Sequence, residues 1–162
     1  MELYHFETSW TIPVGVEPLW HAIIDAESWP TWTPSFRRVT ILGDESVLRL
    51  GSRMECEVKG ALPFTLRFSC RVSEQVTGHS LGLIAWGDVR GTGRWVLEPR
   101  HDGTTATYFW DVGLTNPLLD RLGRTRATRS LMSWNHDRVM EQAGQGLALR
   151  LARSAEQSEP SA

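Results

Sequence analysis

The middle of the chain alternates between hydrophobic and polar residues, which is the pattern of β-strands with one buried face. The clearest run covers 64–72, where the hydrophobic set is Phe64, Leu66, Phe68, Cys70 and Val72. A slip of one residue would bury Arg67 and Arg71 without partners, so we expect the hydrophobic set to point inward. Similar runs predict strands at 4–12, 38–42, 53–58, 81–88, 93–98 and 105–115. Short turns such as Asp102-Gly103 join them, which makes neighbouring strands antiparallel.

Helical spacing precedes and follows this region. A helix is predicted over 16–26, with Pro18 in its first turn, and a short turn over 28–34 places Trp29 and Trp32 at its end. Asn116 and Pro117 begin a helix that we expect to span most of 117–150. Its apolar face comprises Leu118, Leu122, Met132, Met140, Ala143, Leu147 and Leu151. Thr125, Arg129, Ser133 and His136 lie in the same stripe, and Gly123, Gly144 and Gly146 are points where the helix can bend or break.

The order of elements predicts an α+β fold, with a curved antiparallel sheet of six to seven strands wrapped around the long C-terminal helix. A single sheet cannot bury its inner face alone, and a curved one leaves space beneath the helix that covers it. We expect one domain over residues 1–152. Residues 153–162 contain no large apolar side chain, which predicts a disordered C-terminal tail.

Composition narrows the function classes. The 162 residues carry a net charge of −2, from 17 basic and 19 acidic residues, so no electrostatic footprint for nucleic acid is expected. No apolar run approaches the ~20 residues that span a bilayer, so we expect no stable membrane insertion. The first ten residues lack the pattern of a signal peptide, which predicts a cytoplasmic protein with Cys56 and Cys70 reduced.

The eight tryptophans, against five phenylalanines and two tyrosines, are the unusual feature of the composition. Each of them can simply pack in the core, or several can line a cavity, where a flat ring offers a large contact area.

Three segments resemble the START-like, or SRPBCC, helix-grip superfamily, and within it the polyketide cyclase/dehydrase and lipid-transport group. They are 16–26 leading to Trp29-Pro30-Thr31-Trp32, then 91–99 with 103–105, and 134–140 with Gly144 and Gly146-Leu147. The resemblance covers residues 1–152. It implies the helix-grip fold, whereas members of the superfamily include cyclases, hydrolases, lipid carriers and ligand-gated binders.

The sequence shows no catalytic constellation. The five histidines are far apart, without the spacing of metal ligands, so we expect no metal and no cofactor. On the C-terminal helix, His136 and Arg129 lie two turns apart. His136 is either a core or rim histidine or a titratable group in a cavity; Arg129 is either a partly exposed side chain or a fixed cation there. Together they would suit a ligand bearing a carboxylate, phenolate or enolate.

We therefore expect a cavity between sheet and helix that is touched by Phe68, Trp95, Tyr108 and Trp110 from the strands and by Arg129 and His136 from the helix. The leading hypothesis is binding of a hydrophobic or aromatic small molecule, which is polyketide-, lipid- or quinone-like. The second is a polyketide cyclase or dehydratase that acts on a ligand held in the same cavity. The third is an interaction protein whose cavity is filled by tryptophan. The sequence leaves the catalytic residues and the oligomeric state open.

Overall fold

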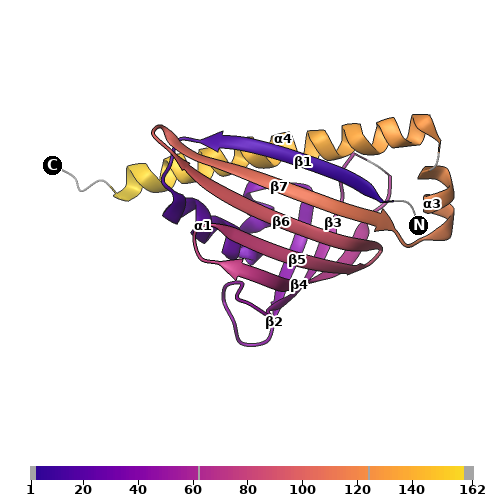
Figure 1. The fold of residues 1–162 in the computed structure, drawn as a ribbon, viewed down its shortest axis with the longest axis horizontal. Helices are drawn as coiled ribbons and strands as arrows, with labels where there is room; N and C mark the ends of the chain where they lie inside the picture. Colours follow the sequence, from indigo (N-terminus) through magenta and orange to yellow (C-terminus); the bar gives the residue numbers. More distant parts are fainter. Residues whose placement is uncertain (1–2, 62, 124, 159–162) are drawn as a thin grey trace.

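The computed structural model describes residues 3–61, 63–123 and 125–158. Its seven strands form one antiparallel sheet in the order β1-β7-β6-β5-β4-β3-β2. The strands are β1 (Tyr4–Ile12), β2 (Phe36–Leu42), β3 (Arg53–Val58), β4 (Leu66–Val76), β5 (Ser80–Gly87), β6 (Val89–Arg100) and β7 (Gly103–Leu114). The helices are α1 (Val16–Ile24), η1 (Ala26–Ser28), α2 (Trp29–Trp32), α3 (Pro117–Gly123) and α4 (Arg126–Ser158). This confirms the predicted α+β helix-grip architecture, in which α4 runs along the curved sheet (Figure 1).

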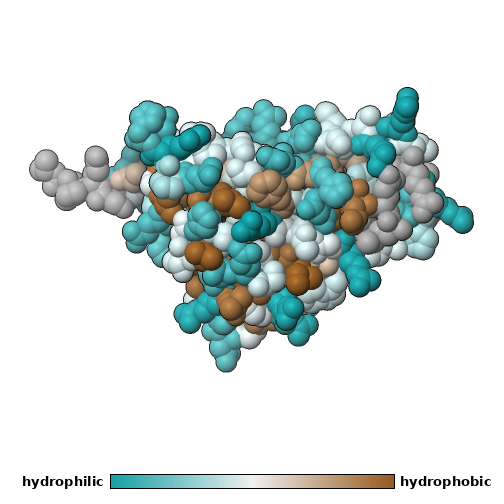
Figure 2. Space-filling model, viewed as in Figure 1, coloured by the Kyte–Doolittle hydropathy of each residue, from teal (hydrophilic) through white to brown (hydrophobic). Residues whose placement is uncertain are grey.

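The alternation of hydrophobic and polar residues along each strand determines which face of the sheet is buried. In β4, Cys70 and Val72 are buried while Arg67 and Arg71 are exposed, as the sequence predicts. The strand begins at Leu66, opposite Val58 of β3, which is two residues later than expected. It ends later than expected because pairing with β5 continues to Val76 across an irregularity between Val72 and Glu74. The side of the molecule shown in Figure 2 is mostly hydrophilic, with hydrophobic residues scattered among polar ones.

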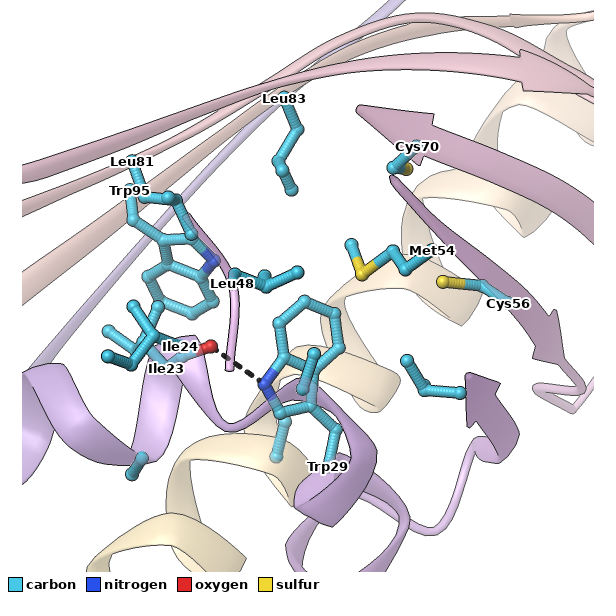
Figure 3. Close-up of a cluster of buried hydrophobic side chains, with 14 of the residues drawn as sticks. Ile23, Ile24, Trp29, Leu48, Met54, Cys56, Cys70, Leu81, Leu83 and Trp95 are labelled. Carbon is cyan, nitrogen blue, oxygen red and sulfur yellow. Dashed lines mark hydrogen bonds between the residues drawn. The ribbon is translucent and has the colours of Figure 1, made fainter. Parts of the chain in front are cut away.

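The core lies between the inner face of the sheet and the helices α1, α2 and α4. Figure 3 shows side chains from α1, α2 and the strands meeting there. Trp29 Nε1 donates a hydrogen bond of 3.1 Å to the carbonyl oxygen of Ile23, which fixes the corner between α1 and α2 (Figure 3). Because that carbonyl is buried and near the end of α1, the indole supplies the partner that the helix end lacks.

The C-terminal helix differs from its prediction in two ways. It is divided into α3 and α4, so Leu118 is 67% exposed and does not continue the apolar face of α4. The side chain of Leu122 lies outside the described residues. The other end of α4 reaches Ser158, so residues 153–158 are helical where we expected a disordered tail, and 159–162 lie outside the described part.

The face of α4 that packs against the sheet is apolar over its second half. Met140, Ala143, Leu147 and Leu151 are buried there, as the sequence predicts. Within the described ranges, no helix is both long enough and apolar enough to cross a bilayer.

Candidate ligand-binding site

A cavity of about 150 Å³ lies between the inner face of the sheet and α4. Twenty-four of the described residues line it, and nearly all of them are aromatic, aliphatic or sulfur-containing. From α4, the lining residues are Met132, Asn135, His136, Val139 and Met140. An apolar cavity of roughly this volume is large enough for a single benzene-sized ring.

The strand side of the cavity is a row of aromatic rings in contact. Tyr108 and Trp110 point to the same face of β7 because they are two residues apart, and their ring centroids lie 5.9 Å apart. Trp110 in turn lies 6.0 Å from the ring of Phe68 on β4. Gly93 of β6 pairs with Trp110. A Cβ atom at Gly93 would lie 2.7 Å from both Tyr108 Oη and Trp110 Cε3, so the glycine makes room for the two rings.

His136 forms part of the helix side of the cavity. Its ring stacks on Phe6 of β1, with centroids 3.9 Å apart and planes 12° apart. The side chain is 13% exposed, and within the described part of the chain neither ring nitrogen has a hydrogen-bond partner. Asp137 Oδ1 is 3.6 Å from His136 Nδ1, beyond hydrogen-bond distance. Burial lowers the pKa of His136 below its ordinary value of 6.5, and Asp137 opposes part of that shift.

This depressed pKa predicts a pH-dependent stability. The unfolded chain binds the proton of His136 more readily than the folded protein, so the free energy of unfolding should fall as the pH drops below 6.5. Chemical denaturation between pH 7.5 and 5 measures this, and His136→Phe should show a shallower decline because it keeps the ring but cannot titrate. The matched control is His101→Phe, at a side chain that is 95% exposed, which should retain the wild-type decline. A decline that His136→Phe leaves unchanged would contradict the assignment.

Two cysteines and Tyr108 contribute further polar atoms to the same cavity. A hydrogen bond with Cys70, followed by burial, raises the pKa of the Cys56 thiol. Burial, and then the nearby thiols of Cys70 and Cys56, raise the pKa of Tyr108 well above its ordinary value. Cys56 and Tyr108 are therefore protonated at neutral pH, and a protonated thiol is a poor nucleophile.

Asn135 anchors the chain that follows β3 to α4. Its Oδ1 accepts a hydrogen bond of 2.7 Å from the backbone N–H of Ala61. A Cβ atom at Gly60 would lie 2.5 Å from Asn135 Oδ1, so a larger residue there would push the Asn135 amide out of this position. Both Gly60 and Asn135 line the cavity, and this contact therefore forms part of its wall.

Residues 4–147 match the sequence profile of the family described as polyketide cyclase/dehydrase and lipid transport. The chain belongs to this family. No curated protein sequence matches it.

Solved structures share the family's fold. Protein TTHA0849 from Thermus thermophilus has a TM-score of 0.74 at 20% identity, covering 93% of this chain and 99% of its own. The ZhuI aromatase/cyclase from Streptomyces sp. R1128 has a TM-score of 0.74 at 13% identity, covering 95% and 96%. A START superfamily protein from Mycobacterium smegmatis has a TM-score of 0.72 at 14% identity, covering 92% and 97%. At these identities the likeness concerns the fold alone, which is the START-like fold expected from the sequence.

The structure brings four of the six predicted site residues to the cavity of this polyketide cyclase-like protein. Phe68, Tyr108, Trp110 and His136 line it. Trp95 does not: it is 6% exposed and packs behind Tyr108, with ring centroids 4.5 Å apart, and on its other side contacts Trp10 at 5.4 Å. It therefore supports the aromatic wall from within the core.

Arg129 also lies away from the cavity. It is exposed, and it precedes Met132, the first α4 residue of the lining, by nearly one turn. Thr125 and Ser133 of the predicted stripe are exposed as well. The expected fixed cation for an anionic ligand is thus missing from the described cavity wall.

Several lining residues were not predicted from the sequence, among them Tyr4, Phe6, Trp29 and Met132. A usable signal exists for the β1 pair, since Tyr4 and Phe6 are two residues apart and belong to the face that ends at the buried Ile12. Met132 was placed on the apolar face of the helix but not assigned to a site. Phe6 and His136 stack although they are far apart in the sequence, so a local sequence pattern cannot predict this contact.

The arrangement is suited to holding and orienting an apolar ligand. Over the described ranges, no three side chains of His, Cys, Asp or Glu come together as they would to bind a metal ion. The groups of the lining whose protonation state follows from their burial are the neutral imidazole of His136, the phenol of Tyr108 and the protonated thiol of Cys56.

Proposed function

We propose that the protein binds a hydrophobic or aromatic small molecule, of polyketide-, lipid- or quinone-like character, in the cavity between the sheet and α4. The observation that carries the proposal is an apolar cavity whose wall includes Phe68, Tyr108 and Trp110 in ring-to-ring contact. Membership of a family described as polyketide cyclase/dehydrase and lipid transport supports it. Because the cavity has about 150 Å³, ligands of one ring are expected to enter without rearrangement, and larger ones require side chains to move.

Titration with toluene tests this proposal. Trp110 and Trp29 line the cavity, whereas Trp86 lies on the outer face beside Arg53. Their indole N–H signals in a ¹H–¹⁵N spectrum report on the two locations separately. We expect saturable shifts of the Trp110 and Trp29 signals and no change at Trp86. A titration that leaves Trp110 and Trp29 unmoved, or moves only Trp86, would refute binding in this cavity.

A second candidate function is a polyketide cyclase or dehydratase. It is favoured by His136, a neutral imidazole whose ring nitrogens have no partner among the described residues, in the same cavity as the Tyr108 hydroxyl. A neutral imidazole can accept a proton from an acidic carbon, and a tyrosine hydroxyl can donate a hydrogen bond to the carbonyl that becomes an enol. The two functions differ in their product, since a binding protein releases its ligand unchanged.

A further inference from the structure

The cavity wall carries polar groups but no formal charge. Among the described residues that line it, none is Lys, Arg, Asp or Glu. The lining side chains that can ionise are His136, two cysteines and two tyrosines. Burial disfavours the charged form of His136 and of Tyr108, and the same holds for Cys56 together with its hydrogen bond to Cys70. These three groups are therefore neutral at pH 7.

Charged residues near the cavity are turned away from it or already paired. The Asp137 carboxylate, which is nearest to His136, has a side chain that is 76% exposed. Glu57 of β3 forms an ion pair with Arg67 at 3.1 Å on the outer side of the sheet. Arg129 is exposed and lies outside the lining. A buried ligand carboxylate would meet no lysine or arginine on the described wall.

An unpaired charge in an apolar site is costly because it loses its hydration without compensation. Burying an alcohol or phenol of the same shape avoids the cost of burying a charge, and one hydrogen bond to its hydroxyl group compensates the lost hydration. The Tyr108 hydroxyl and the amide of Asn135 are the polar groups of the wall that suit this role. The ring nitrogens of His136 are buried and have no hydrogen-bond partner among the described residues.

We propose that the cavity selects uncharged ligands and rejects carboxylates of the same size and shape. This inference rests on the proposed binding function. It reverses the expectation from the sequence, in which Arg129 and His136 suited an anionic ligand. Neutral phenols, alcohols, ketones and esters are the ligand classes that the wall accepts, and free carboxylic acids, which ionise near pH 4, are excluded at neutral pH.

Three one-ring probes test the selectivity: toluene, benzyl alcohol and benzoate. Each is titrated into the wild-type protein at pH 7 and followed through the Trp110 indole N–H signal. We expect toluene and benzyl alcohol to bind and benzoate to bind at least about tenfold more weakly than benzyl alcohol. If benzoate binds within tenfold of benzyl alcohol, the inference is overturned while the proposed function stands. If none of the three binds, the proposed function itself fails.

A lysine introduced into the cavity wall tests whether the missing positive charge is the cause of the selectivity. Met132 lines the cavity, and lysine has a similar unbranched side chain, so Met132→Lys places an ammonium group where the wall lacks one. The matched control is Leu131→Lys, at a neighbouring side chain that is 45% exposed and outside the lining. We expect Met132→Lys to strengthen benzoate binding at least about tenfold and Leu131→Lys to leave it unchanged. A folded Met132→Lys variant without that gain, or an equal gain in Leu131→Lys, would contradict the electrostatic explanation. The wild-type titrations decide the proposal if Met132→Lys does not fold.

Discussion

Replacing Gly146 by alanine is expected to lower the free energy of unfolding by about 2 kcal/mol or more, since it forces two helices apart. Gly146 lies on α4, where it meets α2. A Cβ atom there would lie 2.9 Å from the carbonyl carbon of Trp32 and closer still to its oxygen. These are backbone atoms, which cannot rotate aside as a side chain could. Urea denaturation of the wild type and of Gly146→Ala measures the difference.

Helix propensity alone predicts the opposite result for Gly146→Ala. Alanine is more favourable than glycine inside a helix by about 1 kcal/mol. The neighbouring control is Gln145→Ala, at an exposed position of the same turn, which should change stability by less than about 0.5 kcal/mol. A Gly146→Ala variant as stable as the wild type would show that α2 and α4 do not approach this closely.

Val58→Phe is expected to weaken toluene binding at least about tenfold by filling the cavity. Val58 is half-buried, lies at the end of β3 opposite Leu66, and lines the cavity. A phenyl ring at this position takes up space that the probe needs. Overpacking of this kind costs about 1–3 kcal/mol of stability, which leaves the protein folded if its stability is ordinary. The toluene titration followed at Trp110 provides the measurement.

The matched control for Val58→Phe is Val96→Phe on β6. Val96 is also half-buried but is not part of the cavity wall. The control should bind toluene like the wild type. Equal loss in both variants would mean that a general effect on the fold, and not occupation of the cavity, weakens binding.

The strands could be predicted well because their signal is local. The bounds of β1 and β3 coincide with the predicted 4–12 and 53–58, and the inward face of β4 follows the alternation. β4 and β6 are longer than predicted because their additional residues pair with a neighbouring strand. Val89, for example, is paired with Leu114 on β7. Such pairing depends on residues far along the chain, which a local pattern does not contain.

The helix and the site show the limit of the same reasoning. A helical wheel treats 117–151 as one straight helix, whereas the division into α3 and α4 interrupts the face after Leu118. Arg129 does share the phase of His136, but among the described α4 side chains the cavity lining begins at Met132. Trp95 was expected to touch the cavity, but it packs against Tyr108 and is not part of the described lining. Periodicity predicts the direction in which a side chain points from its helix or strand. Which residues that side chain contacts depends on the complete fold.

The most direct test of ligand binding in this cavity is the position of bound toluene. Nuclear Overhauser effects between toluene protons and protein protons locate the probe without any substitution. We predict contacts to the methyl groups of Met140 and Leu83 and to the Trp110 ring, which line the cavity from three different elements. Contacts confined to exposed side chains such as Leu118 or Leu149, with none to the cavity wall, would contradict the account.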